Sequence, residues 1–342
     1  MSDFKISILL PTYNRSKILL RTIDSILKQN FDNFEILVSD DCSTDDTEYK
    51  VRNIGDDRII YRKNRKNLGI GRNLQACYEE SKGDIIFLMG DDDLLLKDAL
   101  LKTHNAFLKG DNIGLVTRPY YWFWNDLRKP IRAVLPYDSM RDSVISIFDG
   151  RKEIEALFKS AGQLSGLAFK RQCIDVPFHQ DVFPTHIYPF ASILRKYKAV
   201  YLKDFTVAVR TSLSMSTHRR EIYDTSPIES WMIMFKILYS SKDLDAVRTE
   251  CIDFVVRDTY AGLFQIKTTT CSISQVMREI RMILKHHPQS IRDSDFYLDS
   301  VVAIVVPGKL LRKLIDWYKV NLSSRKIIKT IEQKKLSYEG IF

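Results

Sequence analysis

IIFLMGDDD, residues 85–93, joins an apolar run to three consecutive acids, with Gly90 at the junction. The apolar run predicts a buried strand, so the chain places three carboxylates at the carboxyl end of that strand. Carboxylates this close repel one another unless a cation or a ring of hydrogen-bond donors compensates. Mg²⁺ and Mn²⁺ prefer oxygen ligands and often bridge a carboxylate to a substrate phosphate, so they fit this pattern. The alternative is that Asp92 or Asp93 caps the next helix, which would need only one of the three acids.

Strand and helix patterns alternate around this stretch through about the first 120 residues. Apolar runs rich in β-forming residues predict strands at 4–10, 34–39, 59–61, 84–89 and 113–122. Helical periodicity predicts helices at 16–29, 71–81 and 97–107. This alternation predicts an α/β fold with a mainly parallel sheet flanked by helices.

In open sheets of this kind, ligands bind in the crevice beyond the carboxyl ends of the strands. Three of the predicted strands end at Pro11-Thr12, at Asp40-Asp41 and before Asp91. We therefore expect these stretches to converge, which strengthens the prediction of a divalent cation that holds a diphosphate.

The composition is that of a globular protein. The 342 residues are 45% hydrophobic and 28% charged, enough for a sizeable core. The five cysteines show no metal-binding spacing, which favours reduced thiols in the cytoplasm over a thiolate zinc site. No apolar run approaches the ~18 residues that span a bilayer. Residues 1–5 run directly into a strand, so we expect a cytoplasmic protein without a signal peptide.

The formal charge of +9 is concentrated near the end of the sequence, where nine Lys or Arg face three acids over residues 305–342. A basic tail on a nearly neutral body favours a local anionic surface and argues against nucleic acid as a partner. Residues 309–335 mix Leu, Ile, Trp and Tyr with their cations. They therefore predict either a helix that lies on an anionic membrane or one that packs on the rest of the protein or on a second subunit.

Four motifs follow one another in the first third of the chain: ISILLPTYNR (6–15), VSDDCSTDDT (38–47), NLGIGRN (67–73) and GDIIFLMGDDD (83–93). Together they resemble the family 2 glycosyltransferases of the GT-A fold, over roughly residues 4–105. The resemblance implies transfer of a sugar from a nucleotide-diphosphate donor with inversion at the anomeric carbon. It implies a GT-A catalytic domain over 1–220, with a nucleotide-binding half (1–120) and an acceptor half (121–220). Beyond it, the helical pattern from Ile222 onward predicts a helical C-terminal region, 221–342, ending in the basic amphipathic tail 305–342.

The resemblance assigns nucleotide-binding roles to particular positions. Pro11, Thr12 and Asn14 match the loop that packs on the nucleotide base, and Asp41 matches an acid that hydrogen-bonds the base or the ribose. Arg72 follows a Gly-Ile-Gly turn at a predicted helix start, where phosphate binding is favourable. Its alternative role is an ordinary solvated side chain.

The same resemblance points to a metal site. Asp91 and Asp92 match the DxD-type acids, with Asp92 the first candidate to hold Mn²⁺ or Mg²⁺ and Asp91 also near the nucleotide. Asp93 is an extra acid that could join the ligand set. The first position of the motif is Met89 rather than Asp, so the ligand set departs from the usual pattern.

Inverting transfer needs a general base to take the proton of the acceptor hydroxyl. In similar enzymes the base is usually an Asp, often in a Glu-Asp pair, at the start of a helix well after the DxD acids. The corresponding position here falls on Thr185-His186. We predict His186 as the base, because its ordinary pKa of ~6.5 suits proton abstraction near neutral pH. Asp181 is the rival candidate, since a short loop would bring it to the same place.

The sequence thus predicts an inverting, metal-dependent glycosyltransferase in cell-surface polysaccharide synthesis, such as O-antigen or capsule. The basic tail suggests a lipid-linked glycan acceptor and a peripheral position on the inner face of the cell membrane. The alternative is a catalytically inactive, membrane-associated assembly partner that kept the fold, supported by Met89 and the missing Glu-Asp pair. The sugar, the nucleotide, the acceptor linkage and the oligomeric state stay open.

Overall fold

The computed structural model describes residues 4–180, 185–211 and 220–333. The chain forms two compact units. The first contains the residues up to Thr211 together with those from Ile327 onward, and the second contains Ser212 to Lys326. The first unit thus ends at Thr211 and takes in residues from Ile327, whereas the expected division falls after residue 220.

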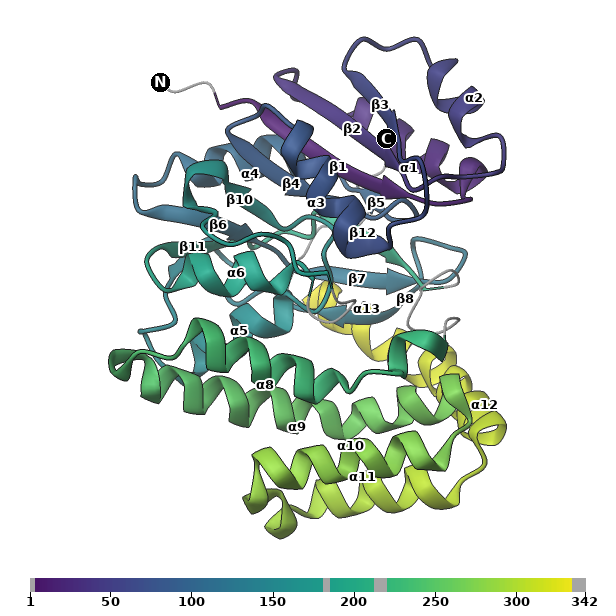
Figure 1. The fold of residues 1–342 in the computed structure, drawn as a ribbon, viewed down its shortest axis with the longest axis vertical. Coiled ribbons are helices and arrows are strands. Elements are labelled where there is room, and N and C mark those ends of the chain that lie inside the picture. Colours follow the sequence, from purple (N-terminus) through teal and green to yellow (C-terminus); the bar gives the residue numbers. More distant parts are fainter. Residues whose placement is uncertain (1–3, 181–184, 212–219, 334–342) are drawn as a thin grey trace. The chain divides into compact units, whose positions relative to one another are not determined.

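The first unit is built on an eight-stranded sheet with the order β3-β2-β1-β4-β10-β6-β11-β9 (Figure 1). The four strands β3, β2, β1 and β4 run parallel, as the alternating pattern predicts. Strand β10 is antiparallel to both of its neighbours, so the sheet as a whole is mixed. Its strands are β1 Ile6–Thr12, β2 Phe34–Asp40, β3 Ile59–Lys63, β4 Ile85–Leu88, β6 Ile113–Thr117, β9 Ser143–Ile145, β10 Ala168–Lys170 and β11 Lys198–Tyr201.

Helices cover both faces of this sheet. Ile6, Ile8 and Leu10 of β1 share one hydrophobic core with residues of α1 and α4. On the opposite face α3 contacts β1 and β2, and Cys77 Sγ donates to the Leu37 carbonyl. The helices of this unit are α1 Ser16–Leu27, α2 Thr47–Arg52, α3 Ile70–Glu80, α4 Ala99–Phe107, α5 Arg151–Ser160 and α6 Ile187–Leu194. The α/β architecture is therefore confirmed.

A second, four-stranded sheet was not predicted. Its order is β5-β12-β7-β8, formed by β5 Leu94–Leu95, β7 Tyr120–Phe123, β8 Pro130–Val134 and β12 Val207–Arg210. The prediction of one strand over 113–122 was wrong, because Arg118 and Pro119 separate β6 from β7 and a proline cannot donate to a sheet. Strand β7 has the aromatic sequence YYWF, and its Tyr120, Tyr121 and Phe123 are buried core residues.

Helix α13 (Ser324–Gln333) adds to the core of this second sheet. Ile331 is 1% exposed and belongs to one hydrophobic cluster with Leu94, Tyr121 and Phe205, and Ile327 packs against the same cluster. Part of the basic tail therefore packs on the first unit.

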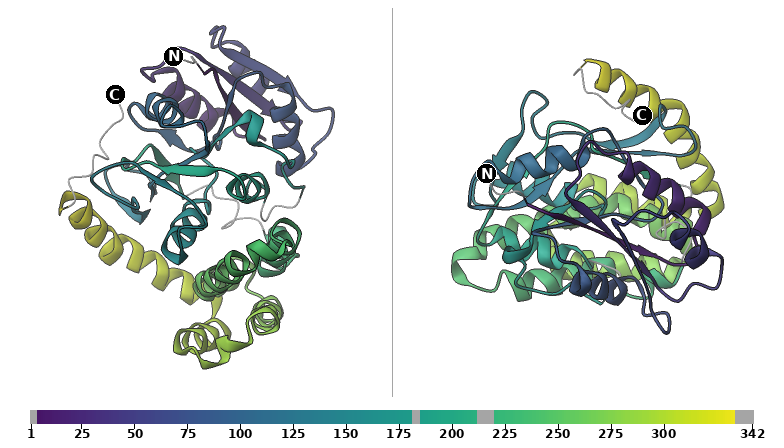
Figure 2. Two further views of the ribbon diagram at one scale, coloured as in Figure 1. Left: turned by 90° about the vertical axis from the view of Figure 1, so that its left-hand side faces the viewer. Right: turned by 90° about the horizontal axis from the view of Figure 1, so that it is seen from above.

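The second unit is helical, as predicted. It contains α8 Pro227–Leu238, α9 Asp245–Thr270, α10 Ile273–His286, α11 Ser294–Val305 and α12 Gly308–Tyr318. Helix α9 contacts α8, α10, α11 and α12, and Figure 2 shows these helices side by side. Side chains of Ser226, Ser272 and Asp293 cap α8, α10 and α11, which fixes where these helices begin.

Across both units, short 3-10 turns lie at Arg171–Cys173, Arg220–Tyr223, Lys242–Leu244 and Pro288–Arg292, and a π-helical turn lies at Lys319–Ser323. Within the described ranges, no helix combines the length and the apolar character needed to cross a bilayer.

Candidate active site

The carboxyl ends of β1, β2 and β4 meet, as the sequence predicts. Thr12 at the end of β1 lies opposite Asp40 in the sheet register, with Pro11 just before it in the same buried strand. The Thr12 carbonyl accepts the N–H of Asp41 at 2.9 Å. Thr12 Oγ1 donates to Asp91 Oδ2 at 2.8 Å, although the two residues are 79 positions apart. Three of the predicted site residues are thus joined directly.

Asp41 organises the loop that leads into α3. Its Oδ1 accepts Asn64 Nδ2 and the Leu68 N–H, both at 2.8 Å, and its Oδ2 accepts the Gly69 N–H at 2.9 Å. Gly69 has φ of 81°, a conformation that favours glycine. A carboxylate offers about four lone-pair directions. Three are used by the loop, which leaves Asp41 about one for a ligand.

Asn14 ties the loop after β1 to the loop after β2. Its backbone has φ of 53°, which Asn tolerates better than most residues. Asn14 Oδ1 accepts the Thr44 N–H at 2.8 Å, and the Asn14 N–H donates to Ser43 Oγ at 2.8 Å. The two loops predicted to bind the nucleotide therefore form one connected surface.

Arg15, which the sequence reasoning missed, bridges two of the three acids. Its Nη1 donates to Asp91 Oδ1 at 2.9 Å and to Asp92 Oδ2 at 3.0 Å. Burial and the neighbouring Asp91 carboxylate raise the pKa of Asp92 to about 6, against the opposing charges of Arg15 and Arg210. The positive charges nearby therefore do not fully compensate these acids, which is the condition under which a divalent cation would suit Asp92. The available signal was the position of Arg15 at the end of the first motif.

Both oxygens of Asp93, like those of Asp91, accept hydrogen bonds inside the fold. Oδ2 accepts Ser165 Oγ at 2.5 Å and Gln163 Nε2 at 3.3 Å, and Oδ1 accepts the Arg210 N–H at 2.8 Å. Burial and the charge of Asp92 raise the pKa of Asp93 well above its usual range. Asp93 therefore holds β12 and the loop before β10 in place. Ser165 and Arg210 carried no sequence signal, since they lie far from the motif in the chain.

The described residues contain no group of three His, Cys, Asp or Glu side chains arranged to hold a metal ion. Asp92, with its raised pKa, is the carboxylate at the strand ends that best fits a divalent cation. Asp91 is engaged by Thr12 and Arg15 and positions the loop between them.

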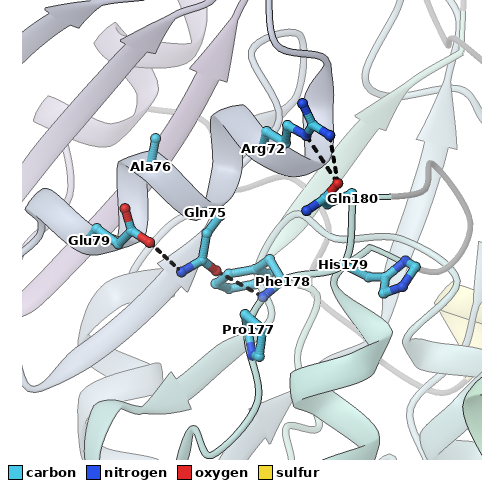
Figure 3. Close-up of a pocket in the computed structure, with 8 residues that line it drawn as sticks. All are labelled: Arg72, Gln75, Ala76, Glu79, Pro177, Phe178, His179 and Gln180. Carbon is cyan, nitrogen blue, oxygen red and sulfur yellow. Dashed lines mark hydrogen bonds between the residues drawn. The ribbon is translucent and has the colours of Figure 1, made fainter.

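Arg72 lies at a pocket of about 360 Å³ between α3 and residues 177–180 (Figure 3). Its Nε and Nη2 donate to Gln180 Oε1 at 3.1 and 2.8 Å. Gln75 Oε1 accepts the Phe178 N–H at 2.9 Å on the same side of α3. A Cβ on Gly71 would lie 2.3 Å from the His179 carbonyl oxygen, so only glycine allows α3 to approach this segment so closely. The first turn of α3 thus holds the backbone that precedes residue 181.

The two candidates for the general base are placed differently. Asp181 lies outside the described residues. His186 immediately precedes α6, and its Nε2 lies 2.8 Å from the Ala161 carbonyl oxygen, so that nitrogen carries a proton. Burial lowers the pKa of His186 to about 4, with a smaller contribution from the positive charge of Arg118. His186 is therefore neutral at pH 7 and a weak proton acceptor.

The part of the chain that forms this site is similar to known sequences. The family model described as "Glycosyl transferase family 2" matches residues 7–157. The chain is similar to the GalNAc(5)-diNAcBac-PP-undecaprenol beta-1,3-glucosyltransferase of Campylobacter jejuni subsp. jejuni. The two are 40% identical over 99 residues, 28% of this chain and 32% of that protein. The chain thus spans about a third of the length of the first curated relatives it matches.

Solved structures match over a longer stretch. S. aureus TarS 1-349 in complex with UDP-GlcNAc superposes with a TM-score of 0.63 at 16% identity, covering 98% of this chain and 93% of that chain. The mannosyltransferase PcManGT from Pyrobaculum calidifontis, in complex with GDP-Man and Mn²⁺, gives a TM-score of 0.55 at 15% identity, with 89% and 87% covered. At these identities the similarity establishes a shared fold.

Proposed function

Because this chain belongs to glycosyl transferase family 2 through residues 7–157, we propose that it moves a sugar from a nucleotide-diphosphate sugar to a hydroxyl of a glycan. The observation that carries the proposal is the meeting of Thr12, Asp41, Asp91 and Asp92 at the carboxyl ends of three neighbouring parallel strands. Ligands of open sheets bind at this edge. The UDP-GlcNAc complex of the similarly folded TarS also supports a nucleotide-sugar donor.

The nucleotide would lie over the connected loops after β1 and β2. Asp41 has about one lone-pair direction free and would accept a hydrogen bond from the base or the ribose. Asn14 and Pro11 shape the loop against which the base packs. Arg72 would reach the diphosphate only after releasing Gln180, so we assign it a secondary role.

Asp92 would hold Mn²⁺ or Mg²⁺ together with the diphosphate of the donor. A single carboxylate plus substrate phosphates is a common ligand set for Mg²⁺. When bound, the cation would neutralise charge that develops on the leaving diphosphate. Asp91 supports the site by fixing Arg15 and Thr12, and Asp93 supports it through Ser165. The Mn²⁺ complex of PcManGT agrees with this proposal.

Transfer would proceed with inversion. The acceptor oxygen forms a bond to the anomeric carbon while the bond from that carbon to the diphosphate oxygen breaks, and a general base takes the hydroxyl proton. Both His186 and Asp181 remain candidates for this base. We favour Asp181, because the lowered pKa of His186 and the nearby charge of Arg118 disfavour an imidazolium at that position.

The acceptor would be a lipid-linked glycan in surface-polysaccharide synthesis, as the name of the C. jejuni relative suggests for that protein. A peripheral position on the cytoplasmic face of the membrane would bring the enzyme to such an acceptor. Leu310, Leu314 and Trp317 support it, since they lie on one face of α12 and are 50%, 53% and 58% exposed.

A thermal-shift panel of nucleotide diphosphates and nucleotide sugars, each with and without Mn²⁺, tests the donor site. A ligand that binds only the folded protein stabilises it by about 2.7 kcal/mol at a concentration 100 times its Kd. We expect one nucleotide to raise the melting temperature only with the metal, and Asp92→Asn to remove this effect. Asp111→Asn, at an exposed acid outside the four motifs, is the matched control.

Absence of a shift with every nucleotide, with or without metal, would contradict the donor site. It would favour an inactive assembly partner that retains the fold.

A further inference from the structure

The helical unit carries a cavity that the proposed transfer reaction does not use. It lies where the end of α9 meets the start of α12 and has a volume of about 480 Å³. Four of its lining residues are cationic and none is acidic; the cations are Arg220, Lys309, Arg312 and Lys313.

The position of the cavity follows from a close helix contact. A Cβ on Gly308 would lie 2.7 Å from the Lys267 carbonyl oxygen and 3.3 Å from Cys271 Sγ, so glycine lets the first turn of α12 approach the end of α9. Lys309, Arg312 and Lys313 are spaced three and four residues apart and therefore share one face of α12. That face lines the cavity.

Only one of these cations, Arg312, has a structural role at the carboxyl terminus of α9. Arg312 Nη2 donates to the Thr268 carbonyl at 2.5 Å, as expected for a cation at the negative end of a helix dipole. Across the described ranges, Arg220, Lys309 and Lys313 form no ion pair. All four cations are exposed, and their positive charges gathered around one cavity favour the entry of an anion.

We propose that this cavity is a binding site for a phosphate group, separate from the donor site. Arg and Lys donors form short, charge-assisted hydrogen bonds to phosphate oxygens. A phosphate or diphosphate ester carries the charge that would compensate several cations at once. The group could belong to a soluble phosphate compound or to a lipid headgroup, and the chemistry of recognition is the same. The proposal does not depend on the transferase activity.

The test compares Lys309→Gln/Lys313→Gln with a control of equal charge, Lys236→Gln/Arg281→Gln, on exposed positions of α8 and α10. Arg312 is left intact because it holds the end of α9. Binding of inorganic pyrophosphate is measured by calorimetry in metal-free buffer, where the acids around Asp92 repel the probe. Sedimentation with phosphatidylcholine vesicles, with and without phosphatidylglycerol, forms the second arm.

We expect the cavity variant to bind pyrophosphate about tenfold more weakly than wild type, since charge-assisted hydrogen bonds are lost, while the control binds normally. Selective loss of binding to phosphatidylglycerol vesicles in the cavity variant would assign the phosphate to a lipid, and unchanged vesicle binding would assign it to a soluble compound. The proposal is overturned if the cavity variant matches the control in both arms. Metal-dependent stabilisation by nucleotide is measured on the same variants, so failure of the donor site would be recognised separately.

Discussion

Asp92 has a neighbouring acid on either side and shares the Arg15 guanidinium with Asp91, and its surroundings favour its neutral form. Asp93 and Asp41 have several donors from the fold on their carboxylate oxygens, as expected of structural acids. Asp92 instead combines a raised pKa with a guanidinium that it shares with Asp91, which fits a residue kept for a ligand.

Asp92→Asn should make the metal-free protein more stable at pH 7 while abolishing metal-dependent nucleotide binding. The pKa of Asp92 is raised from 3.8 to about 6. Between these values the unfolded chain loses the proton first, so the contribution of Asp92 to stability falls as pH rises from about 4 to about 6. Removing the charge should recover about 1–3 kcal/mol at pH 7, at about 1.4 kcal/mol per pKa unit less the lost contact with Arg15.

The measurement is denaturant unfolding in EDTA at pH 5 and pH 7, with Asp111→Asn as the control at an exposed acid. An Asp92→Asn protein less stable than wild type at pH 7 would show that Arg15 fully compensates the acid.

The general base can be identified by comparing Asp181→Asn with His186→Gln. Loss of a general base lowers kcat by about 10²- to 10⁴-fold. We expect this loss for Asp181→Asn, with the nucleotide-induced thermal shift retained. His186→Gln should mainly reduce stability, because its Nε2 contact with the Ala161 carbonyl is altered. The reverse result, a large loss of kcat with normal stability in His186→Gln, would restore His186 as the base.

Among single residues, the sequence predicted the site positions that lie within the motifs at the ends of strands. Thr12, Asp41, Asp91 and Asp92 end neighbouring strands, and parallel strands bring their ends together. Residues that act from a distance could not be predicted. Ser165 reaches Asp93 across 72 positions, and nothing in the chain between them indicates the contact.

At the scale of helices and strands, α13 takes one of the two roles that the sequence left open for the basic tail. The basic, amphipathic pattern of residues 309–335 fits a membrane surface and an internal contact equally well. The structure divides these roles, since Ile327 and Ile331 of α13 pack on the second sheet, whereas Leu310, Leu314 and Trp317 of α12 are exposed. Periodicity indicates an apolar face but not what covers it.

Ile331→Ala should destabilise the first unit by about 2–5 kcal/mol, because it removes a buried side chain and leaves a cavity. Unfolding is followed with and without the stabilising nucleotide, which reports on the first unit. Leu322→Ala, at a side chain that is 48% exposed, is the control and should change stability by no more than about 0.5 kcal/mol. Equal effects of the two substitutions would show that α13 does not hold the second sheet.

Membrane binding is best tested by substitutions in α12, since truncation of the tail would also remove Ile331. Leu314→Ser/Trp317→Ser should reduce binding to anionic vesicles roughly tenfold or more, as one or two large apolar side chains no longer enter the bilayer. Ile233→Ser/Ile237→Ser in α8 is matched, because those side chains are 50% and 58% exposed. Equal vesicle binding by both variants would place the membrane contact elsewhere or exclude it.

At the scale of the whole molecule, the alternating pattern of the first 120 residues predicted the α/β core and its ligand-binding edge. The route of the chain between the two units was not predicted. The second sheet combines residues from 94–95, 120–134 and 207–210, and its cluster is completed by Ile331. Pairing between such distant segments is set by tertiary packing, which local patterns do not encode.

The position of Ile331 near the end of the sequence also affects folding during translation. The last strand of the second sheet, β12, is synthesised about 120 residues before Ile331, roughly 6–25 s earlier at about 5–20 residues per second. During that interval the apolar face formed by Leu94, Tyr121 and Phe205 is not yet covered by α13. A nascent chain of this protein therefore exposes an apolar surface while the helical unit is translated. Chaperone binding to ribosome-bound chains should be strongest during that interval.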